Sequence, residues 1–87
     1  MSELSIQLKW QLGEGELIKG KYSSSHEITY NDQFKLKADA APDWGGDVAN
    51  TNPEQALAAS ISSCHMMTFL ALAAKAKWPV SSYEDKA

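Results

Sequence analysis

The sequence predicts an α+β fold in which antiparallel strands in the N-terminal half precede one long, buried central helix. Two observations lead to this prediction. Apolar and polar residues alternate over much of residues 4–39, and this period of two is typical of strands that bury one face. From residue 53 onward the apolar residues follow a helical period, and the segment has a recognisable start and stop.

The strongest strand signal lies at residues 4–12, LSIQLKWQL, where every second residue from Leu4 to Leu12 is apolar. Three further strands are predicted at about residues 16–22, 26–31 and 34–39. The last two would form a hairpin around Asn31 and Asp32, because both residue types tolerate left-handed backbone geometry.

The helix is predicted over about residues 53–77. Asn52 is a favoured N-cap, and Pro53 in the first helical position loses no hydrogen bond that the helix could have made. Glu54 in the first turn interacts favourably with the positive end of the helix dipole. At the other end, Pro79 disfavours helical geometry for the residue before it and so stops the helix.

This helix has no polar face. Its apolar residues form two stripes, one of Leu57, Ile61, Cys64, Thr68 and Leu72 and another of Ala59, Met66, Leu70 and Ala73. A helix that is apolar nearly all round is surrounded by protein, and a few short strands can cover only one side of it. Residues 80–87 resemble the start of a further strand. We therefore expect residues 1–87 to be the N-terminal part of a single domain, or half of an obligate dimer.

Composition narrows the setting. The chain has 87 residues, a net charge of −3 and no basic cluster, which argues against nucleic acid as a partner. Its polar N-terminus is not a secretory signal, and the apolar run from Met66 to Ala74 is too short to span a membrane. A single cysteine suits a reducing compartment, so we expect a cytoplasmic location.

The helix carries a recognisable motif. NPEQALAA at residues 52–59, followed by SSCHM at 62–66, resembles the central helix of the OsmC/Ohr family, the osmotically induced and organic-hydroperoxide-resistance proteins. Weaker matches lie at residues 22–28, 40–47 and 78–83. The resemblance covers roughly residues 18–87, and its specific part is the spacing between the Asn-Pro-Glu and Cys-His segments.

The resemblance implies an intertwined homodimer that reduces hydroperoxides, often organic ones, at the expense of a thiol reductant. Cys64 would be the peroxidatic cysteine, and Glu54 falls on a glutamate that helps ionise it. The family's resolving cysteine lies in the C-terminal half, which is absent from this chain. No cofactor is implied. The sequence departs from the family in having no arginine, and Ser24 stands where the family arginine aligns. This departure favours the alternative of a non-catalytic dimeric binding or structural module.

The reaction requires a thiolate, because the thiolate and not the thiol attacks the peroxide. Cys64 lies too far along the helix for the N-terminal dipole to help, so a nearby cation must stabilise the anion. His65 is an unsuitable partner, because adjacent helical residues point about 100° apart. We expect a structural or pocket-lining role for it.

Glu54 and Cys64 lie about 15 Å apart along the helix axis and about 80° apart around it, so they cannot touch within one helix. Glu54 would act through an intermediary or on the partner subunit's Cys64. Met66, Phe69 and Trp44 are candidates to line an apolar substrate pocket, although each can equally be plain core. Two histidines and one cysteine without close pairing are weak evidence for a metal site, so we expect none.

Overall fold

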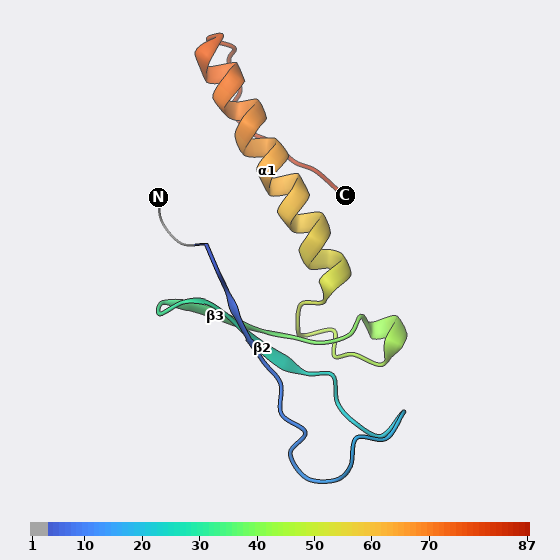
Figure 1. Cartoon of the computed structure of the whole chain (residues 1–87). Coiled ribbons are helices and arrows are strands. Elements are labelled where there is room, and N and C mark those ends of the chain that lie inside the picture. Colours follow the sequence, from blue (N-terminus) through green and yellow to red (C-terminus); the bar gives the residue numbers. More distant parts are fainter. Residues whose placement is uncertain (1–3) are drawn as a thin grey trace. The chain divides into compact units, whose positions relative to one another are not determined.

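The computed structural model describes residues 4–87 and confirms the α+β arrangement (Figure 1). Three strands, β1 (Gln7–Lys9), β2 (His26–Asn31) and β3 (Phe34–Ala38), are followed by a 3₁₀ turn, η1 (Pro42–Trp44), and one long helix, α1 (Pro53–Lys75). The chain divides into two compact units, one that ends at Pro53 and one of residues 54–87. The strands belong to the first unit, and α1 and the C-terminal segment make up the second.

The three strands form one antiparallel sheet in the order β1-β2-β3. The register aligns Leu8 with Ile28 and Ile28 with Leu36, so apolar residues share one face of the sheet. The other face is polar. There Glu27 lies between Lys9 and Lys37, an arrangement of opposite charges that stabilises cross-strand pairs. The sheet thus has the one-sided hydrophobic character that the alternating sequence predicted.

The hairpin between β2 and β3 turns at residues 32 and 33, one position later than predicted. The side-chain oxygen of Asn31 accepts a hydrogen bond from the backbone N–H of Gln33 at 2.8 Å. This local bond lets asparagine mimic a backbone turn, which is the physical reason for its preference at such positions.

Two predicted strands differ from the structure. The predicted strand at 4–12 shortens to Gln7–Lys9, because β1 pairs with β2 only over these three residues. Residues 16–22 are not a strand; they form turns, with Gly20 at a φ of 80° and a backbone bond from Lys21 N–H to the Ile18 oxygen. Alternation favours an extended backbone, but a strand also needs a partner to receive its hydrogen bonds. Residues 80–87 likewise carry no strand assignment in the structure.

A compact loop connects β3 to α1 and is organised around Asp39. The carboxylate of Asp39, only 8% exposed, accepts hydrogen bonds from the backbone N–H groups of Ala40 (2.7 Å) and Asp47 (3.2 Å). Its own N–H donates to the Thr51 oxygen at 2.8 Å, and Thr51 bridges Ala38 in parallel. These contacts hold both ends of the loop together immediately before α1 begins.

The helix begins at Pro53, as predicted, and ends at Lys75, two residues earlier than predicted. Its stop is a Schellman motif. Lys77 adopts a left-handed φ of 60°, its N–H bonds to the Ala74 oxygen, and the N–H of Trp78 bonds to the Ala73 oxygen. Glycine usually occupies this left-handed position. Because position 77 is a lysine, the motif could not be predicted from the sequence. Pro79 follows the end of the helix and is not part of the motif that ends it.

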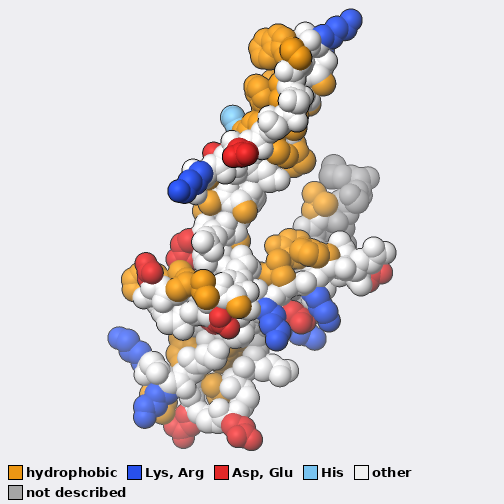
Figure 2. Space-filling view, turned by 180° about the vertical axis from the view of Figure 1, so that it is seen from behind, with side chains coloured by type: hydrophobic (Ala, Val, Ile, Leu, Met, Phe, Trp, Pro, Cys, Tyr) orange, Lys and Arg blue, Asp and Glu red, His pale blue; other side chains and the backbone are white. Residues whose placement is uncertain are grey.

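Within this single chain, most of α1 is exposed. Leu57, Ile61 and Leu72 are each 62% exposed, and Ala73 is the one buried residue among those of α1. Figure 2 shows apolar side chains distributed along the helix surface. Among the described residues the buried apolar ones are Ala38 and Ala73. Few apolar residues are buried because a chain of this size has too few helices and strands to surround a long helix.

By length and composition alone, α1 could cross a membrane. It has 23 residues, and its most apolar window has a mean hydropathy of 1.5. The shorter run from Met66 to Ala74 therefore understates the apolar length of the helix. Core helices of soluble proteins meet the same two criteria, so this property does not distinguish a membrane span from a helix that a protein partner covers.

Candidate functional site

Cys64 lies near the middle of α1 on its exposed apolar stripe. Residues three or four apart are neighbours on a helix surface, which places Ile61 and Thr68 beside the thiol and Leu57 one turn further away. The free thiol is exposed in this chain. The reactive group predicted from the sequence is thus accessible. Its helix-surface neighbours include the apolar Ile61 and Met67 and the hydroxyl-bearing Ser60 and Thr68.

Glu54 is exposed in the first turn of the same helix. Because α1 is continuous from Pro53 to Lys75, the helical arithmetic holds, and about 15 Å of axial rise separates the two residues. His65 is also exposed, and its direction from the axis differs from that of Cys64 by about 100°. Within a single helix, neither side chain can reach the thiol.

Two of the three predicted pocket residues, Met66 and Phe69, share α1 with Cys64. Met66 and Phe69 lie on the opposite side of α1, where they meet the C-terminal segment; the ring of Phe69 packs against Tyr83 with centroids 5.9 Å apart. Trp44 belongs to the other compact unit and is 77% exposed in η1. The pocket-lining role of these residues stays a prediction.

A cavity of about 450 Å³ lies between α1 and the C-terminal segment. The hydroxyl of Ser62 donates a hydrogen bond of 2.5 Å to the Asp85 carboxylate across it. The remaining lining residues are Gln55, Ala58, Ala59, Ser63, Met66, Tyr83 and Ala87. Ser62 is not among the site residues predicted from the sequence, and its contact with Asp85 was missed. The sequence feature that could have indicated this cavity is the cluster of small residues between Ala58 and Ser63 together with the Tyr83-Glu84-Asp85 segment.

In the described part of the chain, residues 4–87, no group of three or more His, Cys, Asp or Glu side chains could hold a metal ion.

Comparison with known proteins agrees with the motif on α1. A family model of OsmC-like proteins matches residues 45–86, which include both Glu54 and Cys64. The chain is also similar in structure to an OsmC-like protein of unknown function from Vibrio cholerae, with a TM-score of 0.86 and 36% sequence identity over 99% of this chain. The chain spans 59% of the length of that protein. No curated protein matches significantly.

Proposed function

Because this chain belongs to the OsmC-like family, we propose that it acts as a thiol-dependent peroxidase that reduces organic hydroperoxides through Cys64. The observation that carries the proposal is the position of the single cysteine. It is exposed at mid-helix, within the residues that match the family model, and at the spacing from Asn52-Pro53-Glu54 on which the resemblance to the family rests.

The first step is a displacement at oxygen. The Cys64 thiolate attacks the distal oxygen of the hydroperoxide, an S–O bond forms and the O–O bond breaks. The leaving alkoxide takes up a proton and departs as an alcohol, while the cysteine becomes a sulfenic acid. A reductant thiol then condenses with the sulfenic acid and releases water. A second thiol reduces the mixed disulfide and restores the Cys64 thiol.

The stripe around Cys64 suits this substrate class. Ile61 and Leu57 would contact the organic part of a hydroperoxide. We further propose that the enzyme works as a homodimer in the cytoplasm. In a dimer, Glu54 can approach the partner subunit's Cys64, which the geometry of one helix does not allow.

Mass spectrometry of Cys64 after brief exposure to cumene hydroperoxide tests the proposal. We expect oxidation to a sulfenic acid, trapped by a dimedone-type reagent, faster than oxidation of a free model thiol. The described chain has no second cysteine to form an intrachain disulfide, so the sulfenic acid should persist, couple to added thiols or proceed to a sulfinic acid at excess peroxide. Oxidation at the rate of the free thiol, in correctly associated protein, would contradict the peroxidase.

A second function, a non-catalytic dimeric module with the same fold, is favoured by one observation. The chain contains eight lysines and no arginine. No residue therefore offers the planar guanidinium that pairs with a carboxylate through two parallel hydrogen bonds. Slow oxidation of Cys64 together with stable dimerisation would support this module.

A further inference from the structure

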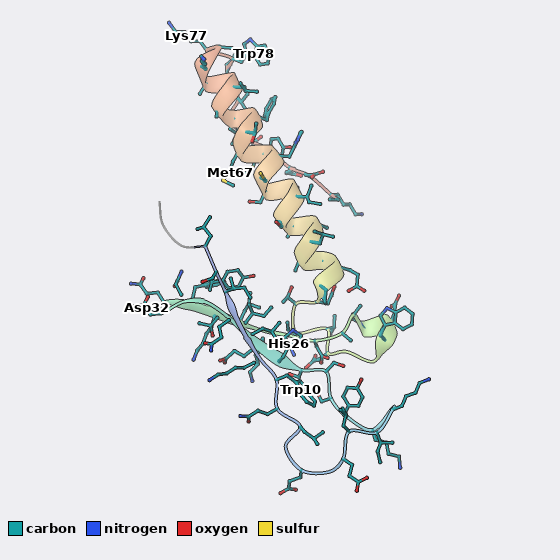
Figure 3. All side chains as sticks on the ribbon, viewed as in Figure 1. Trp10, His26, Asp32, Met67, Lys77 and Trp78 are labelled. Carbon is teal, nitrogen blue, oxygen red and sulfur yellow. The ribbon has the colours of Figure 1, made fainter. Side chains whose placement is uncertain are left out.

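The N-terminal unit contains a shallow cavity, widely open to solvent and lined mostly by exposed residues, that none of the proposed chemistry uses. Its volume is about 350 Å³, within the range of small-molecule sites. It is lined by Leu8, Trp10, Leu17, Tyr22, Ser24 and His26. Figure 3 labels Trp10 and His26 close together near the sheet. The lining contains two aromatic side chains, two leucines and no acidic or lysine side chain.

The aromatic part of the lining is held in place by its own contacts. The indole N–H of Trp10 donates to the Ser23 carbonyl oxygen at 2.8 Å. The ring of Tyr22 meets that of Trp10 edge to face, with centroids 6.2 Å apart and an interplanar angle of 83°. Because the Trp10 donor is already used, the indole offers a ligand its π surface and not a hydrogen bond.

His26 contributes a defined polar atom. Its Nδ1 lies 2.7 Å from the Ser24 carbonyl oxygen. A carbonyl oxygen can only accept, so Nδ1 must carry the hydrogen. In the neutral ring the other nitrogen, Nε2, is then an unprotonated acceptor. The cavity therefore combines apolar and aromatic walls with an imidazole acceptor whose tautomer the backbone sets.

We propose that this cavity binds a small, neutral aromatic molecule that carries one hydroxyl group. The ring packs against Trp10 and Tyr22, where edge-to-face contacts add to simple area burial, and the hydroxyl donates to Nε2 of His26. A charged ligand finds no counter-ion in the lining, and a ligand without a donor leaves the imidazole acceptor unsatisfied. The proposal does not rest on the peroxidase proposal.

Two isomeric probes test the proposal, benzyl alcohol and anisole, which have the same atoms and nearly the same size but differ in having a hydroxyl donor. Titration of the ¹⁵N-labelled chain, followed at the Trp10 indole N–H resonance, should give saturable binding of both. Benzyl alcohol should bind about 5-fold more tightly, as expected for one hydrogen bond. Cys64→Ser should bind the probes as the unmodified chain does, so failure of the peroxidase proposal would leave this result unaffected.

Three variants test whether His26 causes the preference for benzyl alcohol over anisole. His26→Phe keeps a ring but removes the acceptor, and it should lower benzyl alcohol affinity to that of anisole. His65→Phe, which changes the other histidine of the chain, is the matched control and should preserve the preference. Leu17→Lys alters an exposed wall residue without touching the sheet, and it should weaken both probes.

Three results would overturn the proposal. The first is equal affinity of the two probes for the unmodified chain. The second is loss of the preference in His65→Phe as well as in His26→Phe. The third is absence of saturable binding, including the case in which the Trp10 resonance shifts with protein concentration instead, because a second copy would then cover the cavity.

Discussion

Glu54 and Cys64 share one continuous helix, and this restricts what Glu54 can do. It cannot touch the thiol of its own chain, so any catalytic effect must pass through another group or another subunit. Glu54→Gln removes the charge without shortening the side chain. If Glu54 helps to ionise the thiol, this variant should slow oxidation of Cys64 by cumene hydroperoxide by about 100-fold or more, the range typical of a positioned acid or base.

The fold must stay constant for that comparison. Glu54 is exposed, so far-ultraviolet circular dichroism of Glu54→Gln should match that of the unmodified chain. Equal oxidation rates for the two proteins would remove Glu54 from the mechanism and leave the role of Cys64 untouched.

Asp39 is the residue on which the loop before α1 depends. Its carboxylate satisfies two backbone N–H groups in a buried position, and these donors would lose their partner in Asp39→Ala. We expect a destabilisation of about 1–3 kcal/mol, measured as a shift in urea midpoint. Asp43→Ala, an exposed aspartate of η1 in the same loop, is the control and should change stability by less than about 0.5 kcal/mol. Equal effects would show that Asp39 does not organise the loop.

At the level of elements, α1 depends on what surrounds it. Leu57 is 62% exposed in the single chain, whereas Asn52, immediately before the helix, is 3% exposed. Truncating an exposed leucine costs little, but truncating a covered one opens a cavity and costs about 2–5 kcal/mol. Removing the N-cap that we predict at Asn52 should cost about 1 kcal/mol whether or not the helix is covered.

Protein concentration should therefore change the order of the two variants. In dilute solution, Asn52→Ala should destabilise more than Leu57→Ala. At concentrations where copies associate, Leu57→Ala should become the more damaging change, as expected for a central, buried helix. Urea unfolding at both concentrations measures this. An unchanged order would mean that association does not cover the Leu57 side of α1.

The whole molecule exposes more apolar surface than an isolated soluble domain usually does. Leu57, Ile61, Met67 and Leu72 are all more than half exposed on α1, and Leu4, Ile6, Leu8 and Phe34 are so in the first unit. Contiguous apolar patches of this kind mark surfaces that bind protein or lipid. We expect a homodimer, or aggregation where the complementary surface is missing, and light scattering over a micromolar concentration series should show it.

A well-dispersed monomer across that series would contradict this expectation. Co-flotation with lipid vesicles is the informative second measurement, because α1 also meets the length and composition criteria for a membrane span. Association in free solution without flotation would support a protein partner for the helix, and flotation would support the membrane instead.

Several features could be predicted because their causes are local. Asn52 and Pro53 marked the start of α1, Asn31 marked the hairpin, and the alternation of Leu8 with its neighbours marked the two faces of the sheet. The family motif around Cys64 was also readable, since it is a pattern of residue types at fixed spacing. These features rest on backbone preferences and periodicity, which operate within a few residues.

Other features were decided by tertiary contacts. β1 contains only Gln7–Lys9 because β2 supplies partners for those residues alone, and a strand exists only where another strand receives its hydrogen bonds. The pairing of Ser62 with Asp85 and of Phe69 with Tyr83 joins residues far apart in sequence, which no local pattern encodes. Burial of α1 is likewise decided by tertiary contacts. The sequence by itself determined that α1 is a helix that is apolar on all sides. Burial of such a helix depends on its neighbours, and the fold of this chain leaves the apolar surface exposed.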